Sequence, residues 1–158
     1  MMQENHLENV MENRSGRPSF TIRGAYCGDK TLPSLNQYLQ EIGTHPKAGG
    51  RYKKQYLMVI INAIRRDLKR FKTEKPIILH YTFAEPKNGQ KRDRMNVFSL
   101  ADKFIEDALQ ECGVIKDDDP EHVLNCTHDF IYTDGEPYIT VEIEEIDVSV
   151  VERRQIFL

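Results

Sequence analysis

The sequence contains no apolar run near the ~18 residues that a membrane-spanning helix requires. Its three cysteines are an odd number and none lies in a CxxC pair, which argues against both a disulfide framework and a zinc site. The first residues lack the basic flank and apolar stretch of a secretory signal. These absences predict a protein of the reducing cytoplasm that does not contact a membrane.

Common catalytic signatures are also missing. The five histidines show no HxxxH or HExxH spacing, so ordinary surface or core roles are favoured over metal ligation. GxSxG, Walker-loop and dinucleotide-binding patterns are absent. The Gly49-Gly50 pair is interpreted as a hinge between helices rather than as a phosphate-binding loop.

What the sequence does contain is enough apolar material for one domain and a strong charge asymmetry. The chain has 158 residues, 39% of them hydrophobic, and a net charge of -3. Residues 47–94 carry fourteen Lys/Arg and four Asp/Glu, a balance of +10, whereas the rest of the chain has a balance of -13. A basic middle segment is typical of a polyanion-binding face, but also of the solvated side of one helix. Charge alone does not choose between them.

Periodicity and turn residues predict seven secondary-structure elements. They are a strand at 20–24, a helix at 34–42 with Ser34 as N-cap and Gly43 as stop, a helix at 51–71, a strand at 76–83, a helix at 96–112 closed by Gly113, and a hairpin of strands 128–132 and 138–144. This order, β-α-α-β-α-β-β, predicts an α+β fold in which helices cover a mixed sheet. We expect one domain at 18–146, a polar arm at 1–17 and a C-terminal extension at 147–158.

Carboxylates stand at both ends of the helix predicted for 96–112. Asp93 precedes it, and Asp117 and Asp118 follow it. Carboxylates that converge beside a basic surface would suit Mg²⁺, which prefers oxygen ligands. The simpler interpretation from spacing alone is that Asp93 caps the helix and residues 117–119 form a solvated turn.

Three segments add a family resemblance. They are KRDRMN at 91–96, which follows the strand PIILHYTFAEP at 76–86, then KFIEDAL at 103–109, and GVIKDD at 113–118. Together with the proline turn LPSLNQY at 32–38, they resemble the RusA family of Holliday-junction resolvases from about residue 20 to residue 146. The resemblance implies a Mg²⁺-dependent endonuclease, of phage or prophage type, that cuts four-way DNA junctions as a homodimer in recombination and repair.

The resemblance also implies roles for particular residues. Asp93 and Asp118 would be metal ligands, with Asp117 beside them, Asn96 would be the motif asparagine and Lys103 the assisting lysine. Basic side chains would hold DNA backbones without reading sequence. The expected DNA-binding residues are Arg51, Lys54, Arg65, Arg66, Lys69, Arg70, Lys91, Arg92 and Arg94.

One position departs from the family pattern. Met95 stands where the family has its second motif aspartate, and a thioether cannot replace a carboxylate on Mg²⁺. Asp107, or its neighbour Glu106, is the nearest acid on the same helix that could fill the vacancy. The alternative is a catalytically impaired dimer that binds branched DNA without cutting it. A protein-interaction dimer without a nucleic-acid role is a third interpretation.

Overall fold

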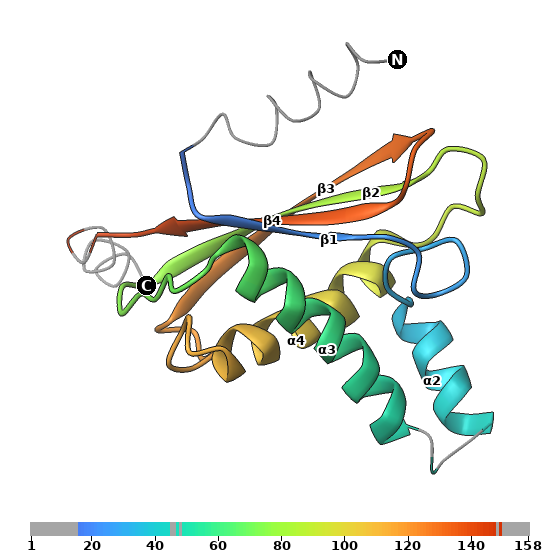
Figure 1. The fold of residues 1–158 in the computed structure, drawn as a ribbon, viewed down its shortest axis with the longest axis horizontal. Helices are drawn as coiled ribbons and strands as arrows, with labels where there is room; N and C mark the ends of the chain where they lie inside the picture. Colours follow the sequence, from blue (N-terminus) through green and yellow to red (C-terminus); the bar gives the residue numbers. More distant parts are fainter. Residues whose placement is uncertain (1–15, 45–46, 48, 148, 150–158) are drawn as a thin grey trace.

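The computed structural model describes residues 16–44, 47, 49–147 and 149 (Figure 1). Most of the predicted arm and of the predicted C-terminal extension lies outside these residues. The elements are β1 (Ser19–Arg23), α2 (Leu35–Thr44), α3 (Gly49–Asp67), β2 (Ile77–Pro86), α4 (Arg94–Glu111), β3 (Val123–Thr133) and β4 (Tyr138–Glu145). The predicted α+β fold, with one mixed sheet and its order of elements, is confirmed.

The four strands form one sheet in the order β1-β4-β2-β3. β4 pairs antiparallel with both β1 and β2, whereas β3 pairs parallel with β2. The predicted hairpin of residues 128–132 with 138–144 is therefore wrong, because β2 lies between those two strands. β2 is buried on both faces, which suits a central strand, and β3 alternates between half-buried and exposed side chains, which suits an edge.

Helices α3 and α4 pack against each other on one face of the sheet (Figure 1). α4 carries the chain from β2 back to the start of the parallel strand β3, as such a connection must. The core lies between these helices and the sheet. Its largest fully buried side chains are Phe20, Ile22, Leu32, Ile60, Ile64, Ile77, Leu79, Tyr81, Phe83, Ile105, Leu109 and Ile143.

Local capping signals in the sequence set most helix ends. At the start of α2 the amide of Gln37 donates to Ser34 Oγ (3.2 Å) and the Ser34 amide donates to Gln37 Oε1 (2.9 Å), a capping box. The predicted helix end at residue 42, before Gly43, is wrong by two residues, since α2 runs to Thr44, whose hydroxyl donates to the Gln40 carbonyl. A single glycine inside a helix lowers its stability but does not end it.

The end of α4 follows its sequence signal closely. Gly113 has φ +71°, its amide donates to the Gln110 carbonyl, and the Val114 amide donates to the Leu109 carbonyl (2.9 Å each). This is a Schellman motif, in which glycine takes the left-handed position at no steric cost. It turns the chain sharply into the 114–122 loop, which returns along α4.

The outer edge of β1 is covered by the last residues of α3. The Thr21 amide donates to Asp67 Oδ2 (2.8 Å), and Arg66 donates to the Thr21 carbonyl (2.6 Å) and to Asp67 Oδ1 (2.8 Å). Burial alone would raise the pKa of Asp67, but the hydrogen bonds from Arg66 and Thr21 lower it below its ordinary value. Two side chains thus occupy backbone groups that an edge strand otherwise leaves open.

Candidate metal centre

Two acidic residues of α4 face the edge strand β3. Asp102 and Glu106 lie one helical turn apart, and Cys126 lies opposite them on β3. One ligand atom from each of the three lies within 4.8 Å of the others. The pairing of β3 with β2 brings Cys126 level with Leu79, beside the helix. The cluster therefore depends on the β2–α4–β3 arrangement rather than on any local sequence motif.

Asp102 is held in place by two neutral donors. The Tyr81 hydroxyl donates to Asp102 Oδ1 (2.6 Å), and the Cys126 thiol approaches the same oxygen at 3.5 Å. Burial, and then the charge of Asp102, raises the pKa of Tyr81 and of Cys126 well above their ordinary values. Both groups therefore remain protonated at neutral pH and act as donors to Asp102.

Glu106 is the most perturbed acid of the cluster. Burial, a hydrogen bond to Asp102 and the negative charges of Asp102 and Asp118 raise its pKa to about 9, although Lys103 opposes the shift. At neutral pH Glu106 therefore carries a proton. A set of carboxylates too close together to ionise fully is a place where a cation can replace a proton.

Lys103 joins α4 to the 114–122 loop. Its ammonium lies 3.1 Å from Asp107 Oδ1 and 3.8 Å from Asp118 Oδ2. The hydrogen bond to Asp107 is the main cause that raises the pKa of Lys103. Asp107 also pairs with Lys53 of α3 (3.4 Å). The structure thus brings three sequence-predicted residues, Lys103, Asp107 and Asp118, to the acidic cluster.

Asp117 is the neighbour of Asp118, and its carboxyl group makes hydrogen bonds within the loop. Its Oδ1 accepts from the Asp118 amide (2.8 Å) and from Gln110 Nε2 (3.5 Å). These bonds shape the loop and fix the direction of Asp118. Asp117 is therefore a positioning residue here, and its carboxylate is partly used within the turn.

Asp93 lies elsewhere. Its Oδ1 accepts from the Asn96 amide (3.1 Å), so it is the N-cap of α4, and its neighbour Met95 is 56% exposed. Ten residues of helix, a rise of about 15 Å, separate Asp93 from Lys103. The structure does not bring Asp93 or Asn96 to Asp118, and it agrees with the simpler capping interpretation of this segment.

Asp102 is the member of the cluster that the sequence interpretation missed. The i, i+4 spacing of Asp102 and Glu106 was a possible signal, because it places both acids on one helical face. That spacing is common on solvated helices, however. Its meaning depends on Tyr81 and Cys126, and the sequence does not reveal that these strand residues are neighbours.

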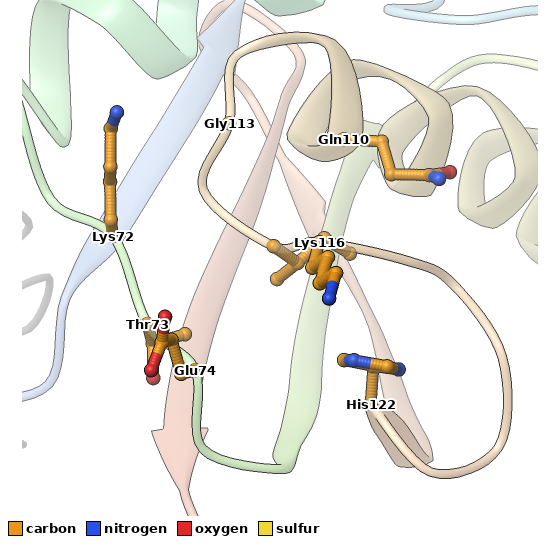
Figure 2. Close-up of a pocket in the computed structure, with 8 residues that line it drawn as sticks. Lys72, Thr73, Glu74, Gln110, Gly113, Lys116 and His122 are labelled. Atoms are coloured by element: carbon orange, nitrogen blue, oxygen red, sulfur yellow. The ribbon is translucent and has the colours of Figure 1, made fainter.

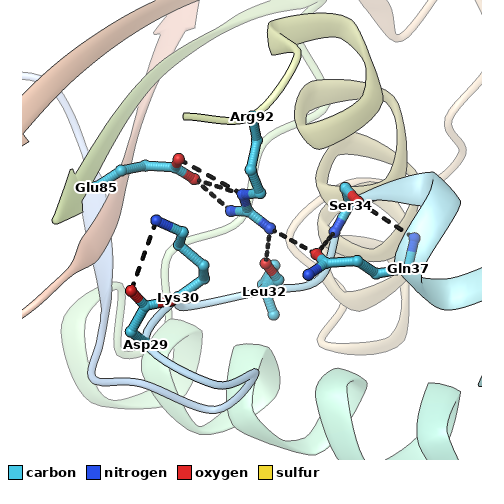
Figure 3. A network of polar contacts seen from close by, with 7 residues as sticks. All are labelled: Asp29, Lys30, Leu32, Ser34, Gln37, Glu85 and Arg92. Atoms are coloured by element: carbon cyan, nitrogen blue, oxygen red, sulfur yellow. Dashed lines mark hydrogen bonds and ion pairs between the residues drawn. The ribbon is translucent and has the colours of Figure 1, made fainter. Parts of the chain in front are cut away.

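Two of the expected DNA-binding residues are engaged in the fold. Arg66 binds Asp67 and the Thr21 carbonyl, as described above. Arg92, with only 9% of its side chain exposed, forms a buried ion pair with Glu85 (Figure 3). Arg92 Nη1 also donates to the Leu32 carbonyl (2.7 Å) and to Gln37 Oε1 (3.2 Å). Arg92 is therefore a structural residue that ties the segment before α4 to α2.

The other expected DNA-binding side chains are on the surface. Lys91 lies over the ring of Tyr132, with its ammonium 3.8 Å from the ring centroid. The remaining exposed members are Arg51, Lys54, Arg65, Lys69, Arg70 and Arg94. Five of the six belong to α3 or to the turn that directly follows it. The basic balance of residues 47–94 is therefore largely displayed to solvent.

A cavity of about 700 Å³ lies between the segment that follows α3 and the 113–122 segment that follows α4 (Figure 2). His122 is oriented there by Asp119 Oδ1, which lies 2.7 Å from its Nδ1. The lining residues are Lys72, Thr73, Glu74, Gln110, Gly113, Ile115, Lys116 and His122. Ammonium groups and a carboxylate share this wall, so the lining does not select a ligand of one charge.

No model of a known protein family matches the sequence, and no curated protein matches it. No helix in the described part of the chain is long and apolar enough to cross a membrane.

Proposed function

We propose that the protein is a divalent-cation-dependent endonuclease of RusA type that cuts branched DNA in the cytoplasm. The observation that carries the proposal is the pair of Asp102 and Glu106 on α4, with Asp118 close enough for its charge to raise the pKa of Glu106 and with the Lys103 ammonium 3.8 Å from Asp118. Asp118 and Lys103 are also the residues that the resemblance assigns to catalysis. The centre proposed here replaces Asp93 and the missing acid at Met95 with Asp102 and Glu106.

The donor set fits a hard divalent cation. Mg²⁺ prefers a few carboxylate oxygens, with water and phosphate completing its shell. Asp102, Glu106 and Asp118 would supply these oxygens, and binding would displace the proton of Glu106. Cys126 keeps its proton because its pKa is raised, so it remains a hydrogen-bond donor to Asp102 rather than a ligand. Asp107 is already paired with Lys103 and Lys53 and would orient Lys103.

The chemistry divides between the cation and the chain. A bound Mg²⁺ would polarise the scissile phosphate and lower the pKa of a bound water. Lys103 would offset negative charge on the phosphate as the bond to the leaving oxygen breaks. Tyr81, on β2, would fix the orientation of the Asp102 side chain through its hydrogen bond. Exposed cations of α3 and of the turn after it, such as Arg65 and Lys69, would hold the DNA backbone.

A four-way junction with two-fold symmetry needs two symmetric cuts for its resolution. Two cuts require two centres, so a C₂ homodimer is part of the proposal. Resolution of Holliday junctions in recombination and repair is the process that such an activity would serve.

The direct test is nicking of a synthetic four-way junction in Mg²⁺. Asp102→Asn and Asp118→Asn should each abolish nicking while junction binding is retained, because one repulsive charge is removed and the shape is kept. Asp134→Asn is the matched control, since Asp134 is also an aspartate paired with a lysine, Lys87 (3.3 Å), but it lies in the loop after β3. Wild-type rates in both site variants would refute the proposed centre.

The second candidate is a branched-DNA-binding dimer without nuclease activity. It is favoured by the positions of Asp93, the N-cap of α4, and Met95, in its first turn, both away from the acidic cluster. The same assay separates the two functions. Salt-sensitive junction binding without any nicking in Mg²⁺ or Mn²⁺ would select the second.

A further inference from the structure

Alternate side chains of β3 form a row of rings beside the acidic cluster. Cys126, His128, Phe130 and Tyr132 project to the face of the sheet that α4 covers, because strand side chains alternate. The His128 ring lies 4.7 Å from the ring of Phe98 on α4, and the Phe130 ring stacks on Phe83 at 4.7 Å. All distances are between ring centroids. We call Phe98, His128, Phe130 and Tyr132 the β3 ledge.

The ledge is open to solvent and flanked by cations. Phe98, His128 and Phe130 are half-buried, and Tyr132 is 40% exposed. The ammonium of Lys91 lies over the Tyr132 ring at 3.8 Å, and Arg94 is exposed at the start of α4. Aromatic rings and positive charges thus occupy the same surface.

The ledge leads to the proposed metal centre. Cys126, at one end of the row, touches Asp102, while Tyr132 is six residues further along β3, or about 20 Å. α4 runs beside the row, with Phe98 one turn before Asp102. A strand of nucleic acid that lay along β3 would therefore pass the carboxylates at one end and Lys91 at the other.

We infer that the β3 ledge binds unpaired bases of a nucleic-acid strand by stacking. A nucleotide presents a flat π-face and a phosphate, and single-strand-binding surfaces combine aromatic side chains with a positive groove. The ledge offers both, whereas its flanking cations would be left unpaired by an apolar protein partner. The inference rests on the proposed function for the nature of the ligand, and it adds that the substrate has unpaired bases next to the cleavage site.

The chain supplies an unusually clean reporter for this contact, because it has no tryptophan. Tyr132→Trp places one indole on the ledge. Ile131→Trp places it at the neighbouring position, which is similarly exposed (42%) but projects to the opposite face of β3. The comparison therefore shows whether DNA contacts the ledge face of β3 in particular, rather than simply lying near the strand.

Both variants are titrated with a short single-stranded oligonucleotide and with the matching duplex, in EDTA so that nothing is cut. We expect the single strand to quench the tryptophan fluorescence of Tyr132→Trp and the duplex to quench it less. Neither should change the fluorescence of Ile131→Trp. Equal quenching at both positions, or none at Tyr132→Trp, overturns it. A fluorescence of Tyr132→Trp that falls as protein concentration rises, in the absence of DNA, also overturns it, because a second copy of the chain would then cover the ledge.

Affinity provides a second measurement that does not depend on the indole. Tyr132→Leu should weaken single-strand binding by about 5-fold or more, whereas Tyr132→Phe should bind as the wild type does. Equal affinity of Tyr132→Leu and wild type overturns the inference. The nuclease proposal fails separately: quenching without junction nicking contradicts the nuclease alone, and nicking without quenching contradicts the ledge alone.

Discussion

Glu106 lies within 4.8 Å of Asp102, one turn earlier on α4, and burial followed by its interactions with Asp102 raises the pKa of Glu106 to about 9. The Tyr81 hydroxyl and the Cys126 thiol contact the same Asp102 side chain from the sheet. Asp102 therefore receives two donors from the sheet on one half-buried side chain, while burial and nearby negative charge keep Glu106 neutral at neutral pH. A proton on Glu106 and a bound cation would therefore compete for the same carboxyl groups.

Glu106→Gln should stabilise the folded protein above about pH 5. The folded-state pKa of Glu106 is about 9, against an ordinary value of 4.5, so the unfolded chain releases this proton first. The wild type then loses stability as pH rises from 4.5 towards 9, whereas glutamine imitates the protonated acid and avoids the loss. Allowing for the partial exposure of Glu106, we expect its melting temperature to exceed that of the wild type by about 2–6 °C at pH 8.

The measurement is thermal unfolding of both proteins from pH 4 to pH 9 without divalent cations. The two curves should converge near pH 4, where both side chains are neutral. Glu111→Gln, at an exposed glutamate at the end of α4, is the control and should show no such pH-dependent gain. A constant difference at every pH would contradict the raised pKa.

Asp93→Ala and Asp93→Ser should separate a helix cap from a metal ligand. Alanine removes the bond to the Asn96 amide and should cost about 1 kcal/mol, or about 2–4 °C in melting temperature. Serine can still cap and should restore most of this loss. Mg²⁺ affinity, measured by calorimetry, should be the same in both variants. Loss of Mg²⁺ binding in Asp93→Ser would instead make Asp93 a ligand.

Met95→Asp should stabilise the helix without improving metal binding. The first turn of α4 contains no acidic residue, and a carboxylate near a helix N-terminus contributes about 0.3–1 kcal/mol. Position 95 is seven residues, or about 10 Å, before Asp102, too far for the two to share one cation. Thermal unfolding and Mg²⁺ titration of the variant test both statements. A clear rise in Mg²⁺ affinity would place the centre at the first turn of α4.

Arg92→Met should lower the free energy of unfolding by more than the loss of its own hydrogen bonds would. It leaves Glu85, whose side chain is 7% exposed, as a buried charge without its ion-pair partner, and breaking such a pair costs about 3–5 kcal/mol. Adding Glu85→Gln should recover part of this loss, because the unpaired charge is then removed. Urea denaturation of the two single variants and the double variant gives the coupling energy. Additive losses would show that the pair is not coupled.

Local signals in the sequence predicted local structure well, and non-local pairing poorly. Ser34 with Gln37 and Gly113 act through neighbours within a few residues, so their roles are visible in the sequence. The partner of β3 is not: alternation indicates a strand but does not say which strand lies beside it. The turn at Asp134-Gly135 suggested a hairpin, although β2 separates the two strands that it connects.

The same division applies to the candidate site. Lys103, Asp107 and Asp118 could be grouped from helical spacing and the family motifs. Asp102 could not, because its surroundings come from Tyr81 on β2 and Cys126 on β3. The engagement of Arg92 with Glu85 was also hidden, since the sequence shows its charge but not its burial.

Asp67 and Arg66 close one margin of the sheet, at β1, and leave β3 as the margin at which the described strands can accept another strand. Growth of the sheet by main-chain hydrogen bonds is therefore one-sided. Two chains joined through their β3 margins would form a self-limiting pair with no free end for a third. Replacement of Asp67 would open the second margin, and a chain with two open margins can polymerise into a linear fibre.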